Sequence, residues 1–261
     1  MNRNILSKLA IGTMLSALAG FAHADFHDDA SAYRSQFSAE VDSKFQAHQP
    51  SPLLNAQAQA LLSEPGIQAL SAPEFVVVVN RHPKSQTVSI FLTDGQSADF
   101  IGASRVSTGV TNRKEHFFTP TGLFENKTEF GNYRAEGTKN ENGVRGLGSK
   151  GMRVFDFGWQ ESTAGWGRQH SAQIRLQMHG TDPDLLERRL GTPASKGCVR
   201  IHHDVNRFID ENGILDQHYA AKPSWVLSKN KKKSPYDGRF MLVVDMPPVD
   251  SAQQSPAAGN N

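Results

Sequence analysis

The chain contains a single cysteine, Cys198, among its 261 residues. One thiol cannot close an intramolecular disulfide, and a zinc site built on it would take its remaining ligands from histidine or carboxylate side chains. Stability must therefore come from an apolar core, and nucleophilic chemistry becomes the leading use of the thiol. Because a lone cysteine is more often an inert buried residue, its sequence neighbours have to decide between the two interpretations.

Long hydrophobic runs are also missing. A membrane-spanning helix needs roughly 20 apolar residues, and the N-terminal apolar stretch from Leu9 to Phe21 is shorter. Basic residues precede this stretch and Ala22-His23-Ala24 follows it, which is typical of a secretory signal peptide. We therefore expect residues 1–24 to be a signal peptide cleaved after Ala24. The mature chain would be exported to the periplasm without a membrane span.

The chain has little excess charge. It carries 28 Lys and Arg against 26 Asp and Glu, and loss of Arg3 and Lys8 with the leader leaves 26 of each sign. A neutral chain gives no support to nucleic-acid binding, which needs a clustered basic surface. The basic cluster at residues 229–233 is expected to be a solvated loop, with contact to anionic wall polymer as the alternative.

Two helical patterns precede the main domain. Apolar residues from Ala30 to Phe45 recur at spacings of three and four, and Leu53 to Leu62 gives a second such stretch that ends at Glu64-Pro65-Gly66. These segments hold too few apolar residues for a core of their own. Residues 25–73 are therefore predicted to be a helical extension that lies against the main domain.

The sequence pattern of residues 74–245 predicts a mainly β domain with short helices. Apolar, β-branched runs separated by turn residues predict strands. They are Val76–Val79, Thr87–Leu92, Ile101–Ser107, Met152–Phe157, Gln173–Met178 and Phe240–Asp245. Residues 126–151 predict a long loop or a pair of short hairpins, and long loops often line sites. Residues 246–261 predict a disordered tail.

The thiol lies close to a histidine that ends a predicted strand, His179. Capping patterns predict short helices over 182–190 and 203–212, which would place Cys198 just before the second. A cysteine nucleophile needs a histidine or a helix N-terminus to favour the thiolate. Gly197 would let backbone N–H groups face a substrate carbonyl, as an oxyanion hole requires. Arg200 could bind a substrate carboxylate with its planar fork or fix the loop through backbone carbonyls.

In combination these motifs resemble the L,D-transpeptidase family, also called the YkuD-type catalytic domain. The resemblance rests on His179-Gly180-Thr181, on Ser195-Lys196-Gly197-Cys198-Val199-Arg200, and on Val106-Ser107-Thr108-Gly109 followed by Thr119-Pro120-Thr121-Gly122-Leu123-Phe124. It covers about Phe75 to His202 and, with the last predicted strand, reaches Asp245. It implies a β-sandwich or barrel catalytic domain.

In that family the cysteine attacks the bond between the third residue of a peptidoglycan stem and a D-amino acid, and an amine resolves the acyl-enzyme. The resemblance implies that Cys198 is the nucleophile and His179 the base, with the Gly180 carbonyl orienting the imidazole. The N–H groups of Gly197 and Cys198 would form the oxyanion hole. The residues implied in substrate binding are Ser195, Lys196, Arg200 and Thr181. Lys196 departs from the histidine that many members carry at this position.

Several acceptors and several rival functions stay open. The acceptor would be the amine of another stem, giving cross-links between third residues, a free D-amino acid, or a lysine of a wall-anchored lipoprotein. On the same scaffold, water as acceptor would make an L,D-carboxypeptidase or an amidase that detaches the lipoprotein. A wall-binding module with a vestigial site and a purely structural exported domain are the non-catalytic rivals. No cofactor is expected, and no metal, because the adjacent His202 and His203 should point apart.

Overall fold

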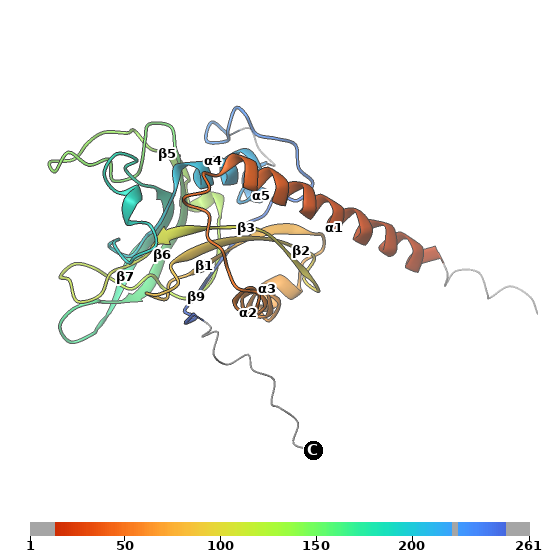
Figure 1. The fold of residues 1–261 in the computed structure, drawn as a ribbon, viewed down its shortest axis with the longest axis horizontal. Helices are drawn as coiled ribbons and strands as arrows, with labels where there is room; N and C mark the ends of the chain where they lie inside the picture. The colour runs from red at the N-terminus through yellow and green to blue at the C-terminus, as the bar shows by residue number, and fades with distance from the viewer. Residues whose placement is uncertain (1–13, 221–223, 249–261) are drawn as a thin grey trace, which may run out of the picture.

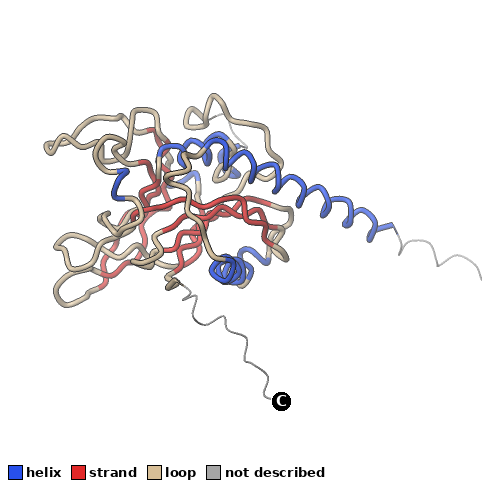
Figure 2. The backbone as a smooth tube through the Cα atoms, viewed as in Figure 1, coloured by secondary structure: helices blue, strands red, loops and turns tan. Residues whose placement is uncertain are grey.

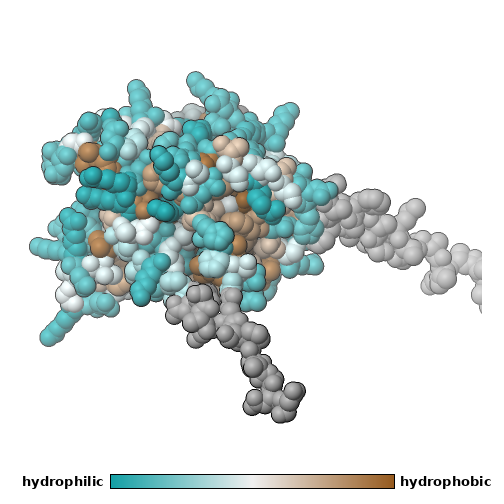
Figure 3. All heavy atoms as spheres, in the orientation of Figure 1, coloured by the Kyte–Doolittle hydropathy of each residue, from teal (hydrophilic) through white to brown (hydrophobic). Residues whose placement is uncertain are grey.

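The computed structural model describes residues 14–220 and 224–248, with side chains from Phe26 onward (Figure 1). The first half of the predicted leader, the side chains at its predicted cleavage point and most of the predicted tail lie outside the described residues. Within those ranges no helix combines the length and the hydropathy that crossing a membrane requires. The face of the molecule seen in Figure 3 is covered mainly by hydrophilic residues, with small apolar patches between them.

One nine-stranded mixed sheet organises the described chain, in the order β4-β9-β1-β2-β3-β8-β7-β6-β5. The strands are β1 (Glu74–Asn80), β2 (Thr87–Thr93), β3 (Ala98–Ser107), β4 (Gly122–Glu125), β5 (Tyr133–Arg134), β6 (Arg153–Thr163), β7 (Ser171–Gly180), β8 (Val199–Ile201) and β9 (Phe240–Val244). Neighbours are antiparallel except β1 with β9 and β7 with β8. The mainly β prediction is confirmed, and Figure 2 shows the strands curling around one another with helices outside them.

The central strands are buried on both faces, which explains their continuous apolar sequence. Every residue of β1 and β2 is buried. Alternate side chains of a strand point to opposite faces, so Val77 and Val79 enter one apolar cluster and Val76 and Val78 another. A strand that is covered on both faces has a continuous apolar sequence instead of alternating apolar and polar residues.

Helices from the N-terminal region cover both faces of this half of the sheet. Helix α1 (Met14–Glu40) packs through Phe26 and Phe37 on the face that contains Val77, and α2 (Ser51–Leu62) with α3 (Pro65–Gln68) covers the other face (Figure 1). A Cβ atom at Gly102 of β3 would lie 2.2 Å from the Phe37 ring. The helix therefore approaches the strand closely because that position has no side chain.

The elements after β7 differ in part from the predictions. Helix α4 (His203–Glu211) is present, as the sequence predicts. Residues 182–190, predicted to be helical, form turns and one 3-10 turn, η2 (Glu187–Arg189). The Asp182 carboxylate accepts the N–H groups of Asp184 and Leu185, which closes a local turn. Such side-chain hydrogen bonds offer the backbone an alternative to the helix. Strands β4, β5 and β8 have four residues or fewer and were not predicted.

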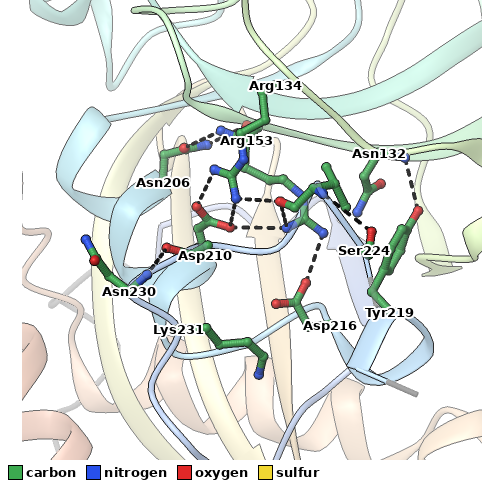
Figure 4. A network of polar contacts seen from close by, with 12 residues as sticks. Asn132, Arg134, Arg153, Asn206, Asp210, Asp216, Tyr219, Ser224, Asn230 and Lys231 are labelled. Carbon is green, nitrogen blue, oxygen red and sulfur yellow. Dashed lines mark hydrogen bonds and ion pairs between the residues drawn. The ribbon is translucent and has the colours of Figure 1, made fainter. Parts of the chain in front are cut away.

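A buried arginine ties the polar segment after α4 to the sheet. Arg153 is fully buried, forms ion pairs with Asp216 at 2.9 Å and Asp210 at 3.2 Å, and donates to the Val226 carbonyl at 2.8 Å (Figure 4). Helix α5 (Gln217–Ala220) lies within this segment. The Lys232 ammonium lies 2.8 Å from Glu40 at the end of α1. The polar segment after α4 thus contacts both the sheet and the N-terminal helix.

Candidate active site

Parallel pairing of β7 with β8 brings the thiol to the histidine strand. His179 pairs with Arg200 and Met178 with Val199, and one further step along this ladder places Cys198 beside Gln177. Paired residues on neighbouring strands present their side chains on the same face, so Cys198, His179 and Arg200 share one. Helix α4 begins only at His203, after β8. Cys198 therefore precedes the second predicted helix, as expected, and β8 separates the thiol from the helix N-terminus.

His179 is held as a neutral base with a defined tautomer. Its side chain is buried, and Nδ1 lies 2.5 Å from the carbonyl oxygen of Gly180. A carbonyl only accepts, so Nδ1 carries the proton and Nε2 keeps its lone pair. Burial, together with the positive charge of Arg200, lowers the pKa of His179 to about 4 despite this hydrogen bond. The imidazole is therefore uncharged at neutral pH.

The thiol of Cys198 is also uncharged at rest. Burial raises its pKa above the ordinary value, and the carboxylate of Asp156 acts in the same direction, whereas Arg200 and a backbone hydrogen bond oppose them. Its Sγ lies 3.7 Å from the Arg175 carbonyl oxygen. The arrangement does not favour a resting thiolate, so a nucleophilic role for this sulfur would require a base to take its proton.

Hydrogen bonds fix the loop that carries the thiol. Ser195 Oγ accepts the Gly197 N–H at 3.0 Å and donates to the Cys198 carbonyl at 2.6 Å. Thr119 Oγ1 donates to the Gly197 carbonyl at 2.8 Å and accepts the Gly109 N–H at 2.9 Å. The separate sequence segments around Gly109 and Thr119 therefore brace the cysteine loop. Gly197 has a φ of 133°, a conformation that side chains disfavour.

The remaining predicted site residues have different surroundings. The Arg200 side chain is half-buried and its Nη1 donates to the Ala194 carbonyl at 3.1 Å. Thr181 is fully buried, and within the described residues its hydroxyl has no hydrogen-bond partner. Lys196 is 68% exposed and its ammonium lies 4.0 Å from Glu115. The structure thus places His179 and Arg200 on the sheet face of Cys198, whereas the Lys196 ammonium turns outward.

The predicted long loop contacts the corner after the histidine. The Arg145 N–H donates to Asp182 at 2.8 Å, and the Arg145 guanidinium pairs with Asp184 at 2.8 Å. A Cβ atom at either Gly148 or Gly180 would lie 2.5 Å from the Met152 sulfur. The loop therefore packs directly on Gly180, whose carbonyl holds the imidazole.

Sequence reasoning missed a polar group on the same face. Asp156 of β6 is buried and contacts Arg175 at 2.7 Å and Gln177 at 2.8 Å. The signal was available, because Arg175, Gln177 and His179 alternate with buried Leu176 and Met178. Such alternation is typical of a strand with one polar face.

A second cluster of histidines corrects another expectation. His202 and His203 converge on Glu187 instead of pointing apart, at 3.3 Å and 2.7 Å. Their atoms lie close enough to surround an ion. However, His202 Nδ1 accepts the Asp204 N–H, so its Nε2 carries the proton and donates to Glu187. A neutral metal-bound histidine needs its second nitrogen to be a donor, so this set does not fit a metal.

Comparison with known proteins gives a family and distant structural neighbours. A family model described as YkuD, the L,D-transpeptidase catalytic domain, matches residues 74–211, just over half of the chain. No curated protein matches.

Two solved structures are similar at low identity. One is the Bdellovibrio bacteriovorus protein Bd1075, with 15% identity and a TM-score of 0.32 over 66% of this chain and 48% of that one. The other is a fused Zn-dependent amidase/peptidase/peptidoglycan-binding domain-containing protein from Clostridium acetobutylicum, with 13% identity and a TM-score of 0.31 over 76% and 65%. The matched part of this chain therefore spans about half of the first protein and less than two thirds of the second.

Proposed function

The chain belongs to the L,D-transpeptidase family defined by the YkuD catalytic domain, and from that premise we propose that it is a cysteine acyltransferase acting on peptidoglycan stem tetrapeptides. It would act outside the cytoplasm, as a substrate in the wall requires. The observation that carries the proposal is the pairing of His179 with Arg200 beside Cys198. This pairing places a base with a free Nε2 lone pair on the same sheet face as the only thiol.

The chemistry follows from two neutral groups. As the Cys198 sulfur bonds to the carbonyl carbon of the third stem residue, its proton moves to His179 Nε2. The imidazolium then gives that proton to the nitrogen of D-alanine, the carbon–nitrogen bond breaks, and D-alanine leaves. An incoming amine attacks the acyl carbon, gives a proton to the same nitrogen and displaces the thiolate, which then takes this proton from the imidazolium. All four proton transfers use one atom whose pKa burial keeps low.

The cysteine loop supplies the surroundings of the reacting carbonyl. The Gly197 N–H is engaged by Ser195, so we assign the oxyanion contact to the Cys198 N–H and a conformational role to Gly197. Ser195 and Thr119 hold this loop, whereas Arg200 and Thr181 shape the pocket. The exposed Lys196 would contact only the outer part of a substrate.

Mass spectrometry of the purified protein with a disaccharide-tetrapeptide tests the proposal. Samples with and without an added D-amino acid are compared with a Cys198→Ala control. Loss of D-alanine with gain of a dimer or an exchanged residue, absent from the control, supports transpeptidation. Loss of D-alanine with only water gained would make the protein an L,D-carboxypeptidase. No change would refute action on this substrate, and a lipoprotein-linked muropeptide would then be the next substrate tested.

A further inference from the structure

A positively charged side chain lies on the thiol's face of the sheet and has no part in the chemistry above. Arg175 of β7 is two residues before Gln177, which the ladder places beside Cys198. The Cys198 Sγ lies 3.7 Å from the carbonyl oxygen of Arg175 itself. Because residues two apart on a strand share a face, the Arg175 guanidinium stands on the same face as His179.

The Arg175 guanidinium is anchored in one position. Its Nε donates to the buried carboxylate of Asp156 at 2.7 Å, and its Nη2 donates to the Phe130 carbonyl at 2.7 Å. Asp156 also accepts from Gln177 and from the Gly158 N–H. An arginine fixed at two nitrogens loses little conformational entropy when it binds a ligand, because it is already ordered.

The same guanidinium remains open to solvent. The Arg175 side chain is 43% exposed, and within the described ranges no residue is a hydrogen-bond partner of Nη1. Across the β6–β7 ladder it pairs with Trp159, which is 65% exposed. An anchored, half-exposed guanidinium beside an exposed indole makes a surface suited to a carboxylate on a peptide.

The Asp156 carboxylate that anchors Arg175 also acts electrostatically on the thiol of Cys198. Besides burial, the charge of Asp156 raises the pKa of Cys198. The pKa of Tyr133, whose hydroxyl lies 3.3 Å from Gln177, is raised by burial and, to a smaller extent, by both Asp156 and Cys198. The Asp156 cluster and the thiol are therefore within reach of one bound substrate.

The direction of the strand decides which half of the substrate meets Arg175. Successive same-face residues are about 7 Å apart, so Arg175 and His179 flank the level of Cys198 on opposite sides. In the proposed reaction, His179 must donate a proton to the nitrogen of the departing D-alanine. We propose that Arg175 binds a carboxylate on the acyl half of the stem peptide, the half that stays on the enzyme after D-alanine leaves. This inference rests on the proposed function.

Two carboxylates on that half have the required chemistry. One is the side-chain carboxylate of the diaminopimelate-type residue at position three, and the other is the α-carboxylate of the γ-linked glutamate at position two. A lysine at position three removes the first, and amidation at position two removes the second. A carboxamide on the position-four residue changes only the leaving half and serves as the substrate control.

Binding to an inactive protein separates this inference from the proposed reaction. Affinities of the four peptides are measured by calorimetry for Cys198→Ala and for Cys198→Ala combined with Arg175→Gln or Arg175→Lys. Arg188→Gln in the same background is the matched control, since the Arg188 side chain is exposed and, among the residues that the structure describes, donates only to the Leu185 carbonyl. Turnover of the unmodified protein is assayed in parallel and reports on the reaction alone.

We expect Arg175→Gln to weaken binding of the tetrapeptide about tenfold, the loss of roughly one charge-assisted hydrogen bond, or about 1.4 kcal/mol. The loss should vanish for one of the two acyl-side analogues and persist for the position-four carboxamide, and Arg175→Lys should restore part of it. Equal weakening for every peptide, no weakening, or binding of no peptide would overturn the inference. A loss that vanishes only for the carboxamide would also overturn it, by placing Arg175 on the leaving half.

Discussion

Nδ1 of His179 lies 2.5 Å from the carbonyl oxygen of Gly180, the next residue in the chain. This contact assigns the proton to Nδ1 and leaves Nε2 as the only basic nitrogen. The orienting group is thus a backbone carbonyl with no charge to stabilise an imidazolium, unlike a carboxylate. Burial therefore dominates, and the pKa of His179 falls to about 4.

The first prediction concerns the acid limb of activity. Since His179 must be neutral to accept the thiol proton, kcat/KM for D-alanine release should stay level from neutral pH down to about pH 5 and fall by half near pH 4. An acid limb near pH 6.5 would contradict the buried, neutral base.

Circular dichroism at each pH must accompany that assay. A histidine whose folded pKa lies below its ordinary value of 6.5 makes the folded state less stable as pH falls from about 6.5 to 4, because the unfolded chain takes up the proton first. Loss of activity counts toward the first prediction only where the far-UV spectrum is unchanged.

The second prediction uses two charges of opposite sign near the thiol. Burial raises the pKa of Cys198, Asp156 raises it further, and Arg200 lowers it. Alkylation by iodoacetamide, followed by mass against pH, should therefore show an apparent pKa above 9 in the unmodified protein. Asp156→Asn should lower that value and Arg200→Gln should raise it. An unchanged pKa in both variants would show that burial alone sets the reactivity.

Much of the sheet could be predicted because its strands are long or uniformly apolar. The valine run at residues 76–79 predicts a strand buried on both faces, and β1 is one. Strand β8 has three residues, too few for a pattern of hydrophobicity. Its partner β7 lies almost twenty residues earlier, and the sequence alone does not show which residues of two parallel strands pair.

The candidate site was likewise predictable in part from the sequence. The motif containing His179 and Cys198 indicates the chemistry, and alternation along β7 could have revealed Arg175. The resting charge of the thiol depends mainly on burial, which only the folded chain defines. His202 and His203 converge because both contact Glu187, which lies in the 3-10 turn η2. The sequence signal for such a turn is weak, so this contact could not be predicted.

The third prediction addresses the network around Arg153. This side chain is completely buried between Asp210 and Asp216 (Figure 4). Arg153→Met keeps most of the volume but leaves the buried Asp216 carboxylate without its ion pair, whereas Asp210 keeps its pair with Arg134. It should lower the free energy of unfolding by about 3–5 kcal/mol in urea titrations.

An exposed ion pair provides the control for that experiment. Lys232→Met breaks the ion pair between Lys232 and Glu40. The Lys232 side chain is 42% exposed and the Glu40 side chain 30%. Such surface pairs contribute about 0–1 kcal/mol. Comparable losses in Arg153→Met and Lys232→Met would show that the buried network contributes no more than a surface pair.

The fourth prediction concerns Glu74 at the start of β1. Its buried carboxylate lies 3.0 Å from Arg239 and accepts from Gln217 at 3.0 Å, while within the described chain Oε1 has no hydrogen-bond partner. Burial outweighs the Arg239 charge and raises the pKa of Glu74 from 4.5 to about 7. The folded state therefore holds this proton more tightly than the unfolded chain does.

That difference gives stability a definite pH dependence. Glu74 stabilises the fold fully below about pH 4.5, and this contribution is lost as pH rises to about 7. A shift of this size corresponds to about 3 kcal/mol. Glu74→Gln cannot ionise, so the fall in unfolding free energy between these pH values should be smaller by that amount. Urea titrations at pH 4.5, 5.5, 6.5 and 7.5 measure it. If the two proteins lose stability in parallel across this range, Glu74 ionises normally in the fold, and Arg239 rather than burial controls its charge.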